Sequence, residues 1–204
     1  MTRRSAHSPN PSREPAAQAT LTDALEAAQA GDEQGFTTLY REFAPRLLRY
    51  ARALVGQDAD DVAAEAWLHI ARDIRGFTGD VDAFAGWSAR ILRNRAIDMA
   101  RYAARRPSYV TATGDIPELA TDDDSADEAM EHAATRSAIA TIASLPKDQA
   151  EAVLLRVVVG LDTQTAAQVL GKRPGAVRVA AHRGLKALAR RLETQNDDLR
   201  GDDV

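Results

Sequence analysis

The segment LGKRPGAVRVAAHRGLKALARRL, residues 170–192, decides the C-terminal part of the fold. Gly171 and Pro174 mark the end of one helix and the start of another, because glycine tolerates the positive φ of a turn and proline suits the first helical position. Arg173 is therefore expected at the N-cap, where it offers no acceptor to the free N–H groups and opposes the helix dipole. A cation at this end suggests an anionic neighbour, although a side chain turned into water is the alternative.

Residues 163–189 fit a helix-turn-helix, in which a short helix over 163–171 is followed by a tight turn and a longer helix. Asp162 or Thr163 is expected to cap the first helix, and Ala167 is small where the two helices cross. The buried stripe of the second helix is predicted to consist of Val177, Ala181, Leu185 and Leu188.

The opposite face of the second helix is basic, with Arg178, His182 and Lys186 at four-residue spacing and Arg190 and Arg191 beyond them. The first turns of such a helix meet base edges in the major groove, where arginine can bind guanine through two hydrogen bonds. The alternative is a three-helix bundle with a solvated basic face. The expected set of duplex-contacting residues is Lys172, Arg173, Pro174, Val177, Arg178, His182, Arg183 and Lys186.

Charge is distributed unevenly along the 204 residues, whose net charge is −4. Residues 36–107 carry a net +3 and residues 136–193 a net +6, whereas residues 108–135 carry −8 without one Lys or Arg. The outer segments, residues 1–35 and 194–204, carry −2 and −3. Two basic blocks separated by an acidic one are compatible with nucleic-acid binding despite the negative total.

The chain has no cysteine, which excludes disulfides and thiolate metal sites. It has no apolar run of membrane-spanning length and no apolar core of a signal peptide, so we expect a cytoplasmic protein without membrane insertion. The four histidines are scattered and no metalloprotease, phosphate-binding or nucleophile motif occurs. We therefore expect no catalytic residues, no metal and no cofactor, and hence no enzyme.

The N-terminal half is predicted to be helical as well. Apolar residues at three- and four-residue spacing indicate a helix from Phe36 to Leu54, ended by Gly56. Asp58 is expected to cap a helix over 58–74 and Asp82 a helix over 83–106, with a loop over 75–82 between them. No segment alternates with period two, so the expected fold is all-α without a sheet.

The composition predicts two small helical domains joined by an acidic flexible linker. The helix-turn-helix is preceded by two further predicted helices, over 136–146 and 147–160. The expected divisions are a disordered extension over 1–20, a helical domain over 21–107, the linker over 108–135, the helix-turn-helix domain over 136–193 and an acidic tail over 194–204.

The helix over 83–106 and the loop before it combine arginines with aromatic residues. This combination is typical of single-strand binding, because cations follow the backbone while rings hold unstacked bases. Alternatively, the aromatic residues are core and the arginines form a solvated face. The expected set is Phe77, Phe84, Trp87, Arg90, Arg93, Asn94, Arg101, Arg105 and Arg106. The helix over 58–74 has an acidic edge of Asp58, Asp61 and Glu65, which is either solvated or a docking site for a basic partner.

Two blocks of the chain resemble the extracytoplasmic-function (ECF) sigma factors of bacterial RNA polymerase. FTTLYREFAPRLLRYARALVGQDADDVAAEAWLHIARDIRGFTGDVDAFAGWSARILRNRAIDMAR, residues 36–101, is similar to sigma region 2. ASLPKDQAEAVLLRVVVGLDTQTAAQVLGKRPGAVRVAAHRGLKAL, residues 143–188, is similar to sigma region 4. The order of the two blocks, with a link between them, is more specific than either block alone.

The resemblance implies a promoter-specificity subunit that directs core RNA polymerase and helps to open the −10 element. Region 4 would read the −35 element as duplex DNA. A base flipped out of the −10 element would be held by the loop from Phe77 to Phe84 together with Trp87, Arg90, Arg93 and Asn94. Asp58, Asp61 and Glu65 would contact core polymerase. The resemblance also implies an anti-sigma factor as a partner. The acidic linker would either mimic nucleic acid in a polymerase channel or act as an extended spacer.

The chain departs from the family at three positions of the recognition helix. Arg173 stands where the family usually has Ser or Thr, and Ala180 and Ala181 replace longer or polar residues. The −35 sequence therefore does not follow from the resemblance. The alternative function is a stand-alone helix-turn-helix regulator, which would bind duplex operator DNA without polymerase.

Overall fold

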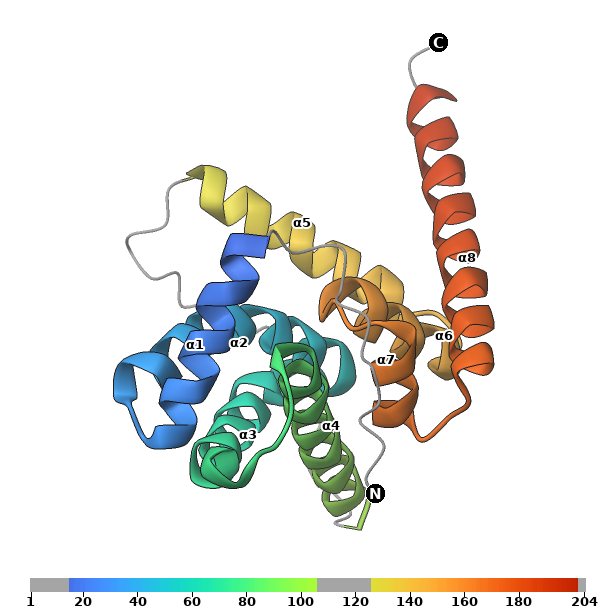
Figure 1. The fold of residues 1–204 in the computed structure, drawn as a ribbon. Helices are drawn as coiled ribbons and strands as arrows, with labels where there is room; N and C mark the ends of the chain where they lie inside the picture. Colours follow the sequence, from blue (N-terminus) through green and yellow to red (C-terminus); the bar gives the residue numbers. More distant parts are fainter. Residues whose placement is uncertain (1–14, 106–125, 202–204) are drawn as a thin grey trace.

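The computed structural model describes residues 15–105 and 126–201, and the regular elements within these ranges are all helical (Figure 1). The predicted all-α class is confirmed. The front domain consists of α1 (Pro15–Ala30), α2 (Glu33–Val55), α3 (Ala59–Asp73) and α4 (Val81–Arg105), with the 3-10 turns η1 (Gly56–Asp58) and η2 (Ile74–Gly76). The helix-turn-helix domain consists of α5 (Ala126–Ala143), α6 (Lys147–Val153), the π-helix η3 (Leu154–Val158), α7 (Thr163–Leu170) and α8 (Pro174–Gly201).

Several expectations concern residues outside the described ranges. They are the extension up to residue 14, the linker over 108–125 and the last three residues of the tail. Within the described ranges, none of the helices combines the length and the apolar character that crossing a membrane requires.

The helix α1 was not predicted, and the expected disorder of residues 15–20 is wrong because they belong to it. Leu21, Leu25 and Ala28 are buried where α1 packs along α2. Alanine supplies much of the apolar face of α1, so its period is weak, and packing against α2 rather than local propensity stabilises it.

The second half differs from prediction at the C-terminal end of the linker. α5 begins at Ala126, inside the segment expected to be a linker, and α8 continues to Gly201, through most of the expected tail. The segment over 108–135 is predicted to be a linker because it lacks a helical period and its charges share one sign, whereas no conformation is predicted for the acidic tail. Residues 126–134 are rich in alanine and glutamate, which are good helix formers, so their like charges do not exclude a helix. The single helix expected over 147–160 is α6 followed by the π-helix η3.

The turn chemistry of the helix-turn-helix agrees with prediction. The Asp162 carboxylate caps α7, accepting from the N–H groups of Gln164 at 2.7 Å and Thr165 at 3.1 Å. Gly171 ends α7 in the left-handed conformation, with φ 63° and ψ 33°. α8 begins at Pro174, and the carbonyl of Arg173 accepts the first helical hydrogen bonds, as expected for the N-cap position.

Of the two caps predicted in the front domain, that of α4 is wrong and that of α3 is right in position only. Asp80, not Asp82, caps α4, because its Oδ1 accepts from the N–H of Ala83 at 2.8 Å. Asp82 lies in the first turn itself and is 9% exposed. Asp58 stands at the N-cap of α3 but makes no side-chain capping hydrogen bond.

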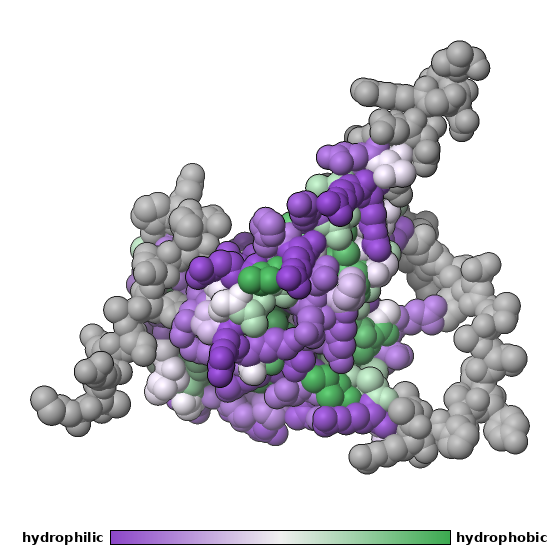
Figure 2. Space-filling model, turned by 90° about the vertical axis from the view of Figure 1, so that its right-hand side faces the viewer, coloured by the Kyte–Doolittle hydropathy of each residue, from purple (hydrophilic) through white to green (hydrophobic). Residues whose placement is uncertain are grey.

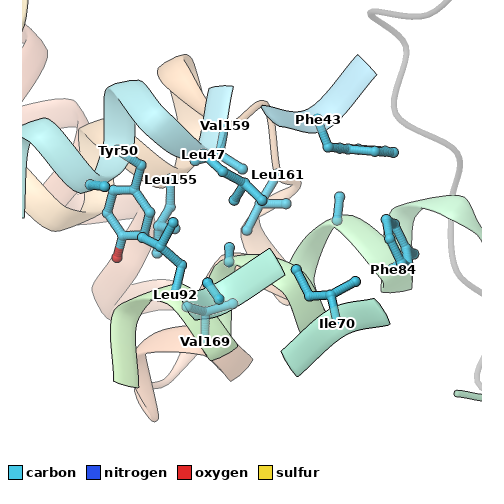
Figure 3. Close-up of a cluster of buried hydrophobic side chains, with 14 of the residues drawn as sticks. Phe43, Leu47, Tyr50, Ile70, Phe84, Leu92, Leu155, Val159, Leu161 and Val169 are labelled. Carbon is cyan, nitrogen blue, oxygen red and sulfur yellow. The ribbon is translucent and has the colours of Figure 1, made fainter. Parts of the chain in front are cut away.

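The two domains share one hydrophobic core (Figure 3). Leu47 and Tyr50 of α2 and Leu92 of α4 lie beside Leu155 of η3 and Val169 of α7, and all five are at most 6% exposed. The two domains, which are predicted only to be joined by a flexible linker, therefore pack face to face. A smaller cluster of Leu145, Ala150 and Val153 lies within the helix-turn-helix domain.

Replacing Asp162 by Ala should lower the free energy of unfolding by about 1 kcal/mol, since it removes the acceptor at the start of α7. Chemical denaturation monitored by circular dichroism measures this change. Asp162→Asn keeps an oxygen acceptor and is the matched control, for which we expect a smaller loss. An equal loss in both variants would mean that the cap contributes nothing specific.

Candidate nucleic-acid interface

The buried stripe of α8 differs from prediction at one position. Val177 and Ala181 are buried, at 0% and 8% exposed, and Leu188 is half-buried, but Leu185 is 47% exposed and Gly184 takes its place in the interior. At about 100° per residue, position 184 lies about 20° from Val177 around the helix, whereas position 185 lies about 80° away. Gly184 has no apolar side chain, so the apolar period of the sequence does not mark it as part of the buried stripe.

The basic face of α8 is open to solvent. Arg178, His182 and Lys186 are exposed, as are Arg173 and Arg183. α8 lies on the side of the molecule that faces the viewer in Figure 2, and this side is mainly hydrophilic with small, separate hydrophobic patches. The predicted face therefore exists as one accessible surface.

Two members of the predicted duplex-contacting set are engaged elsewhere. Val177 is completely buried, so its expected DNA contact is wrong. The Lys172 ammonium lies 2.6 Å from the carboxylate of Asp148 on α6. This hydrogen bond holds the pKa of Asp148 below its usual value. Pro174 is half-buried at the start of α8.

The loop between η2 and α4 carries an aromatic cluster. The ring centroids of Phe77 and Trp87 are 5.0 Å apart, and both residues are half-buried. Phe84 lies 5.8 Å from Phe77 and 5.3 Å from Phe43 of α2, and it is 0% exposed. Phe84 is therefore a core residue, and its expected contact with a base is wrong.

A cavity of about 530 Å³ lies beside this cluster. Phe77, Trp87 and Arg90 of the front domain line it on one side. Thr165, Gln168 and Val169 of α7 line it on the other. The cavity thus belongs to both domains, which no local pattern in the sequence indicated.

The polar residues of α4 fall into two groups. Arg90, Asn94 and Arg101 are exposed, as expected for a surface that meets a nucleic-acid backbone. Arg93 instead pairs with Glu151 of α6 at 3.0 Å, with the two side chains only 18% and 8% exposed. The predicted side chains of Arg105 and Arg106 lie outside what the structure describes.

The Arg93–Glu151 pair lies beside a buried tyrosine. Burial raises the pKa of Tyr50 above its usual value, and the nearby Glu151 carboxylate raises it further. The positive charge of Arg93 has the opposite, smaller effect. The phenol therefore remains neutral, and the pair lies in a poorly solvated part of the interface between the domains. Sequence reasoning missed Glu151, whose only signal was a charge within an apolar helix.

The acidic edge of α3 is exposed along its length. Asp58, Asp61 and Glu65 all face solvent, on the side opposite the buried stripe that contains Val62. Leu68 continues the edge one turn beyond Glu65 and is 73% exposed. The described residues contain no group of three or more His, Asp or Glu side chains arranged to hold a metal ion.

A residue of α1 supports the aromatic loop. The side-chain amide of Gln29 donates a hydrogen bond of 2.8 Å to the carbonyl of Phe77. Gln29 is half-buried, and α1 also packs against η2 and α4. Sequence reasoning missed this residue, because the two partners are 48 positions apart and no motif connects them.

A two-domain helical protein with an exposed basic recognition helix and a second, arginine-rich aromatic site belongs to the class of DNA-binding proteins. Comparison with known families is more specific. Residues 39–106 match the family described as sigma-70 region 2, and residues 135–188 match sigma-70 region 4. The helix α1 precedes both matches.

Relatives match over most of the chain. It is 32% identical over 189 residues to the ECF RNA polymerase sigma factor BldN of Streptomyces coelicolor, covering 88% of this chain and 70% of that protein. It is 32% identical over 181 residues to the ECF sigma factor SigD of Mycobacterium tuberculosis, covering 83% and 82%. The fold is similar to that of CnrH, solved in complex with the cytosolic domain of CnrY, with a TM-score of 0.59, 23% identity and coverage of 86% of this chain and 98% of that one.

The chain therefore belongs to the sigma-70 family, in its ECF group. It is a sigma factor, a non-catalytic subunit that directs RNA polymerase to promoters. The alternative of a regulator that acts without polymerase is not supported, since both sigma regions are present in the family order.

Replacing Gln29 by Leu should loosen the aromatic loop, because the Phe77 carbonyl loses its donor. A hydrogen bond of this kind contributes about 1 kcal/mol, or about fivefold in an opening equilibrium. Hydrogen exchange of the amides of residues 77–80 should be faster by about that factor. Gln34→Leu, at an exposed position of α2, is the matched control. Equal exchange in the two variants would contradict a positioning role for Gln29.

Proposed function

We propose that this sigma factor reads the −35 element through the exposed face of α8 and holds a −10 base in the cavity beside Phe77. We propose further that the acidic edge of α3 contacts core polymerase. The observation that carries the proposal is the presence of two separate DNA-compatible surfaces in one chain of the sigma family.

The first turns of α8 are suited to reading paired bases. Arg173 and Arg178 are exposed at the end that enters the groove in a helix-turn-helix. Bidentate hydrogen bonds from arginine distinguish guanine from the other bases. Arg183, Lys186 and Arg190 lie further along the helix, where phosphates supply the anionic partner. The cation at the N-cap is then accounted for by the nearby DNA charge.

The cavity beside Phe77 is suited to an unpaired base. Phe77 and Trp87 offer ring edges and faces, and Arg90, Asn94 and Arg101 offer polar groups along the exposed side of α4. Extruding a base costs a few kcal/mol, and stacking on an aromatic ring returns about 1–3 kcal/mol. Because the two terms nearly cancel, specific contacts in the cavity decide which sequence opens.

The edge of α3 combines negative charge with an apolar residue. Asp61 and Glu65 are exposed one turn apart, and Leu68 extends the same edge. Exposed carboxylates attract a basic partner surface, and an apolar residue next to them adds buried area on contact. An anti-sigma factor stays a prediction from the family resemblance.

Arg178→Ala should reduce run-off transcription by core polymerase plus this protein in a way that depends on one −35 position. The expected loss is about 1–3 kcal/mol in the free energy of binding, confined to promoters with the cognate base. Arg183→Ala is the contrasting variant, since losing a phosphate contact weakens all sequences alike. A uniform loss with Arg178→Ala would contradict direct readout. Transcripts without defined 5′ ends from the unaltered protein would overturn the proposed function.

Replacing Asp61 and Glu65 together by Lys should abolish co-purification with core polymerase, because the charge of the α3 edge is reversed. Circular dichroism should remain unchanged, since both side chains are exposed. The matched control replaces Asp23 and Glu26 by Lys, which makes the same charge change on the exposed side of α1. Retained binding with the α3 variant, or equal loss with the α1 variant, would contradict the assignment.

A further inference from the structure

An apolar residue interrupts the basic face of α8. Val179 is 49% exposed, and the cationic residues around it, Arg178 and Arg183, are exposed too. The proposed function gives the two arginines a role in binding DNA but leaves the valine without one. Burying apolar surface is favourable, so an apolar group of the ligand at this point would add to binding.

The position of Val179 around α8 separates it from the other exposed apolar residues of that helix. At about 100° per residue, Val179 lies about 160° from the buried Val177, on the opposite side of the helix. Leu185 and Leu192 lie only about 80° and about 60° from Val177, so they border the buried stripe. Among the side chains described on α8, Val179 is therefore the large apolar one that faces away from the core.

The outermost line of α8, opposite the buried stripe, consists of residues at spacings of four, three and four: Gly175, Val179, His182 and Lys186. Gly175 and Val179 lie in the first two turns, which meet base edges when such a helix enters the major groove. Neither side chain offers a hydrogen bond. Arg178 and Arg183 lie on the two sides of this line. The part of the helix that would enter the groove is thus apolar at its centre and cationic at its flanks.

Gly175 indicates that a ligand comes close to α8 at this end. A Cβ added at Gly175 would meet no atom within 4 Å beyond the backbone of its own helix, and the residue does not have a positive φ. The described part of the chain therefore gives no reason for a glycine, which weakens a helix relative to alanine. Glycine allows close approach of a ligand to the backbone, and such an approach brings Val179, one turn further on, against the bases.

We propose that Val179 contacts the 5-methyl group of a thymine in the −35 duplex, as a specificity-determining residue beside Arg178. In the major groove this methyl group marks an A·T pair, and alkyl side chains recognise it by contact. The polar edges of the other bases would lose water against the valine without gaining a hydrogen bond. This inference rests on the proposed function, because it names the base chemistry that the exposed face of α8 selects.

Replacing thymine by uracil removes only the methyl group and so tests the proposal. The probe is holoenzyme, formed from core polymerase and the full chain, bound to a duplex that contains the promoter mapped by run-off transcription. Each thymine of the −35 element is replaced in turn. One replacement, within about two base steps of the position that Arg178→Ala affects, should weaken binding about fourfold, as expected for one buried methyl group. A −35 element without an A·T pair, or one in which no replacement weakens binding, would overturn the inference.

A valine variant assigns the methyl contact to its residue. Val179→Ser should bind the thymine and uracil duplexes equally, because serine has no alkyl group to lose contact. Val157→Ser is the matched control, since Val157 is 57% exposed on η3 rather than on α8, and it should keep the fourfold difference. Circular dichroism should be the same for both variants and the unaltered protein, since both valines are exposed. A thymine–uracil difference that persists in Val179→Ser would contradict the assignment.

Salt dependence separates this contact from a phosphate contact. Arg183→Ala should reduce the salt slope of duplex binding by about 1, whereas Val179→Ser should leave the slope unchanged because no charge is lost. A slope reduced by Val179→Ser would contradict a methyl contact. Defined transcripts combined with equal binding of the thymine and uracil duplexes would overturn this inference alone. Absence of defined transcripts from the unaltered protein would overturn the proposed function and this inference with it.

Discussion

Leu155 and Val169 of the helix-turn-helix domain are buried among Leu47, Tyr50 and Leu92 of the front domain, and the rest of the structure depends on this shared core. Small domains bury a limited fraction of their surface and are only marginally stable alone. Packing the two modules together removes more apolar surface from water than either could remove separately. The same packing brings α7 against α4 and thereby creates the cavity that both domains line.

Charge in this protein acts locally rather than through its total. The net charge of −4 would repel DNA if it were spread evenly, yet the exposed face of α8 presents arginines and a lysine together, and the edge of α3 presents carboxylates. At physiological ionic strength, interactions between exposed charges fade beyond about 8 Å. A DNA duplex at α8 therefore experiences the basic face, and a protein partner at α3 experiences the acidic one. One small chain can in this way offer surfaces of opposite sign.

The two proposed DNA sites differ in how the shared core affects them. The recognition face of α8 is exposed to solvent and lies outside the shared core. The cavity beside Phe77 lies at the junction of the domains, so its shape depends on how the two domains pack.

The sequence by itself determined the features that depend on neighbouring residues. The 3.6-residue period located α2, α3 and α4, and the turn chemistry of Asp162 and Gly171 located the helix-turn-helix. These features follow from hydrogen bonds within a few positions, so a local pattern contains the information. Sigma regions 2 and 4 occur in the family order, and this order made the family and its function recognisable from the sequence.

Only the tertiary structure decided which side chains remain available for function. Phe84 and Val177 are predicted to contact DNA but are completely buried. Leu185 is predicted to belong to the buried stripe of α8 but is exposed, and Gly184 is buried in its place. Arg93 finds Glu151 across 58 positions, and Gln29 reaches Phe77 across 48. Such contacts depend on the angle and distance at which whole helices pack, and no spacing within one helix encodes them. The sequence therefore indicated the kind of protein, and packing between the domains decided how its sites are formed and covered.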